Sequence, residues 1–279
     1  MNIPFDLLHI VASFHTKPRM KLLDWIPEDK IDWDYLSLNP NALHMLEAQP
    51  EKINWKVLSQ NPNTIHLLEL VLQHDPEKID WNSLSRNPNA IHMLEIVLQH
   101  DPEKINWKWL SKNPNALHML EANPSKIDWG LLSMNPNAIH ILELVLQHDP
   151  EKPLAVIDWY YLSLNLNAIH MLEANPEKIN WEQLSFNPNA IHMLEANSHK
   201  IEWVYLSANP TAIHMLEANP EKINWWLLSQ NPQALHILKT NPEKINWELF
   251  SSNPSIFEID TKQYDIYLKK KAKDIDYYV

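Results

Sequence analysis

Hydrophobic residues recur along this chain in a repeated phrase rather than in one long amphipathic stretch. The segment "NPTAIHMLEANPEKINW", residues 209–225, has near copies on both sides of it. In each copy a short apolar segment follows a tryptophan, and a second apolar stripe follows an Asn-Pro pair. On a helical wheel the second stripe lies on one face, as it does for Ala42, Leu43, Met45 and Leu46. The pattern therefore predicts two short helices in each copy.

Ten tryptophans mark the copies at spacings of 22, 26, 26, 22, 30, 22, 22, 22 and 22 residues. A short period of this kind is typical of a solenoid, in which stacked units share a continuous core. Helices this short are only marginally stable alone, so stacking must stabilise them. The anchors are Trp33, Trp55, Trp81, Trp107, Trp129, Trp159, Trp181, Trp203, Trp225 and Trp247.

Asparagine, aspartate and proline mark the expected helix boundaries. Asp or Asn precedes every anchor tryptophan except Trp203, which follows Glu202, and such a short acceptor caps a helix start. In the first unit we expect a helix over 33–38, ended by Asn39 in the left-handed conformation. Asn39 should also cap a second helix over 40–48, whose proline occupies the first helical position. The second helix should end before Pro50.

The longer units also fit this scheme. The units of Trp55, Trp81 and Trp129 carry four extra residues after the glutamate of the second helix. Four residues make about one helical turn, so the second helix should lengthen without rotating its faces. The 30-residue unit adds a proline-led loop at 153–156.

Composition excludes several classes of function. The chain has 279 residues, 45% of them hydrophobic, with no cysteine and a single glycine, Gly130. Phosphate-binding loops, dinucleotide-binding loops and nucleophile elbows need several glycines, so we expect no enzyme and no cofactor. The formal net charge of −12 and only two arginines argue against nucleic acid as a partner. No apolar run approaches the ~18 residues that would span a membrane, and the missing cysteines fit an intracellular protein.

The repeated wording N-P-x-A-I-H-x-L-E followed by I-x-W-x-x-L-S resembles the short tandem-repeat proteins of large double-stranded DNA viruses of protists. The resemblance covers residues 31–259, and "NPSIF" at 253–257 looks like the closing unit of such proteins. It implies a helical solenoid with an interaction function, located in the host cytoplasm, and it supplies no catalytic residues. Leu166 departs from the Asn-Pro signature, and Ser198-His199 replaces Pro-Glu, so we expect weaker caps there.

The leading segment "IPFDLLHIVASF", residues 3–14, looks like the first helix of an F-box. That resemblance implies a ubiquitin-ligase subunit as a partner. The other interpretation is an amphipathic capping helix in which Leu7, Leu8, Val11 and Phe14 cover the first layer. The two interpretations are compatible.

Nine units carry a histidine at the same position, and in eight of them a glutamate follows three residues later. Residues three apart are neighbours on a helix surface. The favoured interpretation is structural, with each imidazole bonded to a neighbouring loop or helix. A pH-responsive column and a metal site are the alternatives, but packed helices lie too far apart for a straight column to converge on one zinc ion. The column comprises His44, His66, His92, His118, His140, His170, His192, His214 and His236.

Two positions vary freely between copies: the residue after the anchor tryptophan and the residue after the serine. They lie four apart on the first helix, so they share one face. Along the array this ridge changes from basic to apolar and aromatic, which is typical of interaction surfaces. We predict that it binds a protein partner, with an acidic segment facing its basic part; the alternative is a surface without a ligand. The predicted binding residues are Lys56, Arg86, Lys108, Lys112, Met134, Tyr160, Leu164, Phe186 and Trp226.

Together these patterns predict an all-α, right-handed-type solenoid of about ten helix-turn-helix units. Residues 1–30 should form an N-terminal capping segment, 31–253 the solenoid, and 254–279 a C-terminal cap. We expect an open array with helical caps, on the order of 100 Å along its curved axis. The predicted function is a non-catalytic protein-binding scaffold or adaptor. The alternatives are a ubiquitin-ligase substrate adaptor and a structural component of the virion.

Overall fold

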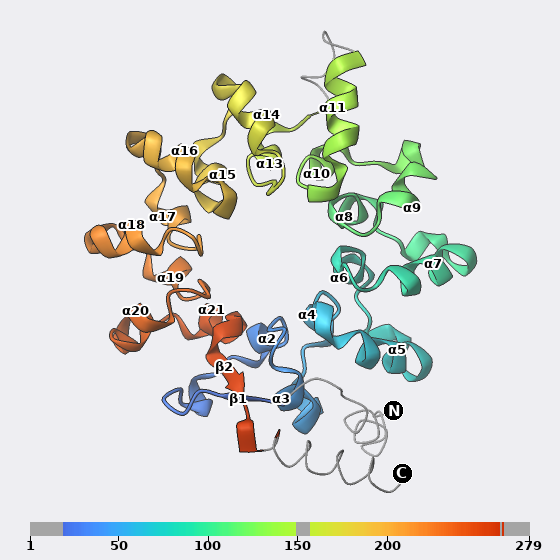
Figure 1. Ribbon diagram of the computed structural model, residues 1–279. Helices are drawn as coiled ribbons and strands as arrows, with labels where there is room; N and C mark the ends of the chain where they lie inside the picture. The colour runs from blue at the N-terminus through green and yellow to red at the C-terminus, as the bar shows by residue number, and fades with distance from the viewer. Residues whose placement is uncertain (1–18, 149–156, 263, 265–279) are drawn as a thin grey trace, which may run out of the picture.

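The computed structural model describes residues 19–148, 157–262 and 264, and it confirms the all-helical repeat architecture. Each of the first nine units places its first helix in an inner row and its second helix in an outer row, and the tenth contributes an inner helix (Figure 1). The inner row consists of α2 (Trp33–Leu36), α4 (Trp55–Leu58), α6 (Trp81–Arg86), α8 (Trp107–Lys112), α10 (Trp129–Leu132), α13 (Trp159–Leu162), α15 (Trp181–Phe186), α17 (Trp203–Leu206), α19 (Trp225–Leu228) and α21 (Trp247–Ser252). The outer row consists of α3 (Leu43–Ala48), α5 (Ile65–His74), α7 (Ile91–His100), α9 (Leu117–Glu121), α11 (Ile139–His148), α14 (Ile169–Ala174), α16 (Ile191–Ala196), α18 (Ile213–Ala218) and α20 (Leu235–Lys239).

Short 3-10 turns join the helices. One turn follows each described outer helix except α11 and covers the Pro-Glu-Lys motif or its variant, as in Pro50–Lys52. Ser198–Lys200 forms the same turn without the proline, so the departure at Ser198-His199 leaves the backbone path unchanged. The four extra residues lengthen α5, α7 and α11 to ten residues, against six in α3, which confirms the predicted extra turn.

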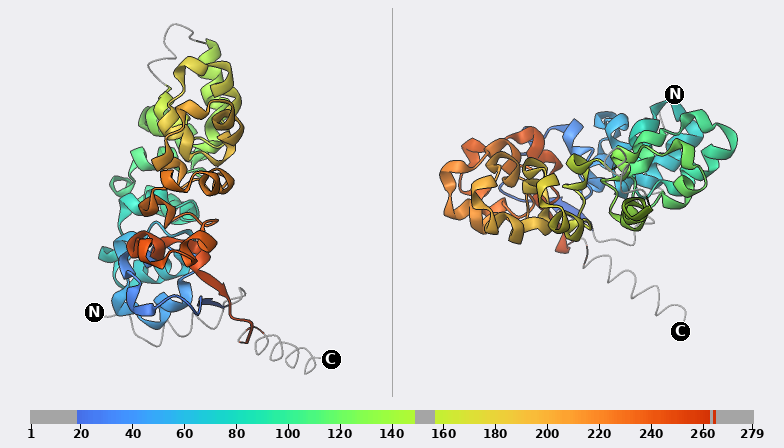
Figure 2. Two further views of the ribbon diagram at one scale, coloured as in Figure 1. Left: turned by 90° about the vertical axis from the view of Figure 1, so that its left-hand side faces the viewer. Right: turned by 90° about the horizontal axis from the view of Figure 1, so that it is seen from above.

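The array closes on itself as a ring, whereas the sequence suggested an open solenoid with two ends. Helix α2 of the first unit packs against α21 of the last unit. In the edge-on views the units form one layer and do not climb as an open superhelix (Figure 2). The ten units therefore form a continuous ring, in which the first unit contacts the last.

The two ends of the described chain meet in a small sheet. Strands β1 (Met20–Leu22) and β2 (Phe257–Ile259) pair antiparallel, with Lys21 opposite Glu258. The Lys21 ammonium lies 2.9 Å from the Glu258 carboxylate, and its hydrogen bonds to Glu258 and Asp24 raise the pKa of Lys21. The tenth unit thus continues as a strand where other units form an outer helix. Residues 1–18, 263 and 265–279 of the predicted capping segments lie outside the described residues. The β1–β2 pair lies in the outer row between α20 and α3 (Figure 1).

A buried asparagine in every unit forms a ladder around the whole ring. Its Nδ2 donates to the carbonyl oxygens of the serine and the asparagine of the preceding unit, at 2.8–3.1 Å. Asn39 makes these bonds to Ser251 and Asn253, so the ladder has no end. These asparagines are at most 1% exposed: Asn39, Asn61, Asn87, Asn113, Asn135, Asn165, Asn187, Asn209, Asn231 and Asn253.

The same asparagines shape the backbone in a way the sequence suggested only in part. The Oδ1 atom of Asn187 accepts from the backbone N–H two residues on, as predicted for a cap. None of the described residues has positive φ, however, and Asn187 is extended at φ −79° and ψ 114°. The predicted left-handed conformation of Asn39 and its equivalents is therefore wrong. The asparagine ends the first helix because its side chain bonds to the neighbouring unit.

A second ladder runs through the serines of the inner helices. Each serine hydroxyl donates to the carbonyl of its own anchor tryptophan and accepts the backbone N–H that precedes the next anchor; in α8, Ser111 bonds to Trp107 and Asp128 at 2.8 and 2.9 Å. Asp32 makes the equivalent bond to Ser251 at 2.9 Å, which again joins the first unit to the last. The predicted Asp or Asn caps accept a backbone N–H of the first turn, as Asp128 does from Leu131, whereas Glu202 makes no such bond.

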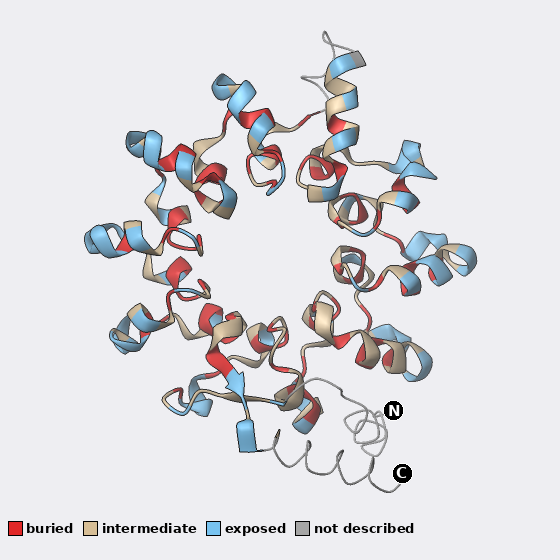
Figure 3. Ribbon diagram, viewed as in Figure 1, coloured by how far each residue is buried: buried red, intermediate tan, exposed pale blue. Residues whose placement is uncertain are grey.

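Aliphatic side chains fill the centre of each layer, and the tryptophans lie at its edge. Leu36, Ala42 and Leu46 are fully buried, whereas every anchor tryptophan is only partly buried. In six units a lysine of the next 3-10 turn lies over the indole ring, 4.3–5.3 Å from its centroid. Figure 3 shows buried residues along the inner row and exposed residues on the outward ends of the outer helices.

Two predicted features lie outside the described residues. These are the F-box-like segment at 3–14 and the loop at 153–156. Within the described ranges, no helix combines the length and apolar character that crossing a bilayer requires.

We predict that Asn187→Ala destabilises the ring by about 2–4 kcal/mol, because it removes the side-chain donor of two buried carbonyls, those of Ser163 and Asn165, and also removes a cap. The Asn165 carbonyl keeps its bond from the Ala168 N–H, so the larger loss is at Ser163. Chemical denaturation followed by circular dichroism measures this loss. The matched control is Asn189→Ala, whose exposed amide makes one bond, to the carbonyl of Leu166; it should cost less than about 1 kcal/mol. Equal effects of the two substitutions would contradict the role assigned to the buried ladder.

We also predict that Lys21→Cys combined with Glu258→Cys forms an intramolecular disulfide. The two residues are directly opposite in an antiparallel pair, where Cβ atoms come close enough for cross-linking, and the natural chain has no cysteine to compete. A faster-migrating monomer on a non-reducing gel reports the closed ring. Pairing Lys21→Cys with Glu103→Cys is the control. Cross-linking only between molecules would show an open array.

Candidate functional site

The variable ridge of the inner helices contains an apolar groove. A groove of about 620 Å³ runs across α8, α10, α13, α15 and α17 on the inner side of the ring. Five predicted binding residues line it: Lys112, Met134, Tyr160, Leu164 and Phe186. The fold therefore brings together residues from four separate units.

The floor of the groove is formed by the residue that follows each ladder asparagine, a position that the sequence indicated only as a helix boundary. The residue after each ladder asparagine contributes one side chain per unit. Four of these are prolines, and Leu166, which takes the place of a proline, lies in the middle with 42% of its surface exposed. The five are Pro114, Pro136, Leu166, Pro188 and Pro210. Leu166 was noted as a weaker cap, yet its side chain widens the apolar floor.

Two further lining residues were missed because they lie outside the two positions that vary freely between copies. Gln183 and Tyr205 each follow an anchor tryptophan by two residues and line the groove at its α15–α17 end. The Gln183 amide donates to the Glu182 carboxylate at 3.4 Å, and the Tyr205 hydroxyl bonds to the same carboxylate, which raises the pKa of Tyr205. This end of the groove therefore has a fixed acidic group beside it.

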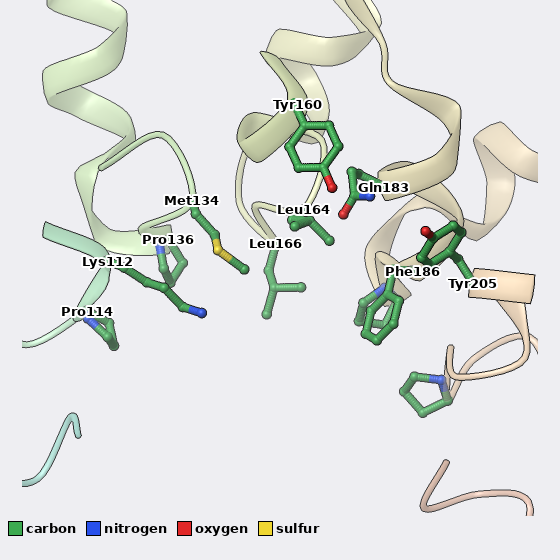
Figure 4. A pocket seen from close by; sticks show the side chains of 12 residues that line it. Lys112, Pro114, Met134, Pro136, Tyr160, Leu164, Leu166, Gln183, Phe186 and Tyr205 are labelled. Atoms are coloured by element: carbon green, nitrogen blue, oxygen red, sulfur yellow. The ribbon is translucent and has the colours of Figure 1, made fainter. Parts of the chain in front are cut away.

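The opposite end is basic. Figure 4 shows Lys112 entering from this side, with Met134 and Leu166 between it and the aromatic rings of Phe186 and Tyr205. Burial lowers the pKa of Lys112, and the positive charge of Arg86 lowers it further. The groove thus runs from a basic end through an apolar centre to an acidic end.

Four predicted binding residues do not line the groove: Lys56, Arg86, Lys108 and Trp226. Lys56 and Lys108 are exposed on α4 and α8, and Trp226 is 54% exposed on α19. Arg86 lies behind the basic end, with its guanidinium stacked 3.3 Å from the Trp109 ring centroid. Its Nε atom is buried without a hydrogen-bond partner. The ridge therefore continues beyond the groove on both sides.

The histidine column forms contacts between units on the outer helices. Each histidine from His66 onward meets the glutamate of the preceding unit, and Nε2 to Oε1 distances are 2.7–2.9 Å in five of these pairs. In these five pairs, more than half of the histidine side chain is exposed. This geometry confirms that the imidazoles bond to a neighbouring helix. Among the described residues no three His, Asp or Glu side chains converge as metal ligands.

No protein-family model, no curated protein and no solved structure matches this chain. The assignment of the groove therefore rests on its own geometry.

We predict that zinc leaves the melting temperature unchanged, because no three ligating side chains converge among the described residues and zinc needs about four ligands. Differential scanning calorimetry over a zinc titration measures this. A saturable rise of several degrees would show a metal site. The control titration uses magnesium, which prefers oxygen ligands.

Proposed function

We propose that this protein is a non-catalytic, ring-shaped scaffold that binds a protein partner through the inner ridge and its groove. The observation that carries the proposal is the convergence of Lys112, Met134, Tyr160, Leu164 and Phe186 on one groove. These residues occupy the freely varying positions, whereas the positions that hold the ring together barely vary between units. The ring could therefore change its binding surface without changing its fold.

The composition of the groove supports a protein partner. Exposed apolar surface is usually an interaction site, and tyrosine and other large side chains are common anchors there. Tyr160 is 43% exposed, and its ring packs edge-on against Tyr161, which restricts its motion. Such a fixed aromatic ring contributes contact area without losing much conformational freedom on binding.

The arrangement of the polar residues supports a role without catalysis. The histidines and glutamates most suited to acid–base chemistry contact one another on the outer helices, in single pairs such as His118–Glu95 and His192–Glu173. The groove on the inner helices is lined by apolar and aromatic residues, with one lysine and one glutamine. The candidate acid–base residues and the groove thus lie in different rows of the ring.

We predict that replacing Tyr160, Phe186 and Trp226 together with serine removes the proteins that co-purify with the ring from the cells that produce it. The three changes delete the aromatic side chains of the ridge while keeping both hydrogen-bond ladders. Quantitative mass spectrometry of affinity-purified protein measures the loss. Ile96→Ser, on the exposed side of α7, is the matched control because Ile96 is 55% exposed and lies in the outer row. An unchanged set of co-purified proteins in the triple variant, with circular dichroism confirming the fold, would contradict the proposal.

A further inference from the structure

The groove presents two parallel rows of side chains with one member of each row per unit. One row is the floor of prolines and Leu166. The other is the residue after the ladder serine and includes Met134, Leu164 and Phe186. Because both rows repeat with the units, a ligand that follows the groove meets an equivalent site at every step. Its own side chains must repeat at the same distance.

That distance distinguishes between peptide conformations. Packed helices lie about 8–10 Å apart, which sets the step between units. A polyproline II helix has three residues per turn and a rise of about 3.1 Å, so the same face returns every ~9.3 Å. An α-helix presents the same face every ~5.4 Å, which is shorter than the step between units, so its side chains would fall out of register with the groove. The step between units therefore favours a polyproline II segment.

The backbone of the groove floor offers few hydrogen bonds to a ligand. The carbonyl oxygens of Pro114, Pro136 and Leu166 already accept from asparagine side chains of the next unit at 2.8–2.9 Å. Proline has no N–H to donate. The N–H groups of an ordinary extended strand would give up their hydrogen bonds to water on binding and would find few acceptors on this floor. A proline-rich segment lacks most of those N–H groups and loses little.

The basic end of the groove requires a particular charge. Lys112 and Arg86 lie near each other there, and the structure gives Lys112 no ion pair or hydrogen bond among the described residues. Arg86 bonds weakly to Gln60 at 3.5 Å and stacks on Trp109. A carboxylate placed between the two cations would relieve their repulsion. The acidic end, where Glu182 is held by Tyr205 and Gln183, would repel a second carboxylate.

We propose that the groove binds a proline-rich segment of a partner protein in the polyproline II conformation, with an apolar side chain at every third residue and an acidic side chain at the Lys112 end. This rests on the proposed protein-binding function and specifies its ligand. Aromatic-lined grooves bind such segments because the polyproline II conformer is already extended and loses little entropy on binding.

Fluorescence anisotropy with labelled synthetic peptides tests the proposal on the full-length ring. The first probe is a peptide of four Leu-Pro-Pro repeats preceded by one Asp, and the second has the Asp after the repeats instead. Both are needed because such a segment can lie in the groove in either direction. A scrambled peptide has the same composition without the three-residue period, and an α-helical amphipathic peptide carries the same leucines. We expect the tighter of the two periodic peptides to bind at least tenfold more tightly than either comparison peptide.

Substitutions locate the peptide in the groove. Phe186→Ala should weaken binding at least tenfold. Lys112→Met should weaken the Asp peptide about tenfold and leave its Asn analogue unchanged, because the substitution removes the charge and keeps an apolar stem. Ile96→Ser on the outer row should have no effect. Each variant is first shown to retain the parental melting curve.

Two results would overturn the proposal. One is equal binding of the scrambled peptide, and the other is tighter binding of the α-helical peptide. If co-purified proteins still depend on Tyr160, Phe186 and Trp226 in that case, the ring remains a protein-binding scaffold with a different ligand. If those proteins are also unaffected, both proposals fail.

Discussion

The fold depends on one buried amide group that is repeated around the ring. The ladder asparagine bonds through Nδ2 to two carbonyls of the preceding unit and through Oδ1 to a backbone N–H of its own unit, as Asn187 does. A buried carbonyl without a donor costs about 1–3 kcal/mol, so each unit strongly favours the presence of the next. An aliphatic side chain of the same size could fill the space but could not satisfy these groups. The asparagine thus ends one helix, caps the next and joins neighbouring units. This explains how units of about 22 residues can be stable although their helices have only four to six residues.

Closure follows from the same interaction. In an open array the Nδ2 group of the first asparagine would have no acceptor in a preceding unit, and the carbonyls of the last serine and asparagine would lose their side-chain donor. In the closed ring the Asn39 amide donates to the Ser251 carbonyl. The rings of Trp25 and Phe250 also pack together, with their centroids 5.9 Å apart. The β1–β2 pair then holds the chain ends in the outer row, where the tenth unit lacks a helix. A ring closed in this way has no exposed terminal layer, and disrupting one unit affects both neighbours of that unit.

The local structure could be predicted from the sequence because each local feature depends on residues close to it in the chain. The Asp and Asn caps, the extra turn of α5, α7 and α11, and the buried face of the second helix all depend on residues within one unit. Closure was not predictable in the same way, since Lys21 and Glu258 are far apart in sequence and neither belongs to a repeated motif. One signal was present: Glu258 stands where other units carry the column histidine, so the last unit was visibly different. The anchor tryptophans are partly buried and pack against the core at the edge of each layer, and in six units a lysine lies over the indole ring.

The sequence predicted only part of the candidate site, because only some of its lining residues vary between copies. Variation between copies identified the surface that the ladders do not use, and five of its nine predicted residues line the groove. The remaining lining residues belong to positions with a structural role, such as the prolines and Leu166, whose side chains face the groove while their carbonyls serve the ladder. A single position can therefore serve the fold through its backbone while its side chain lines the groove. The ladder fixes the spacing of the lining residues, so the interaction that closes the ring also sets the period that the proposed partner would have to match.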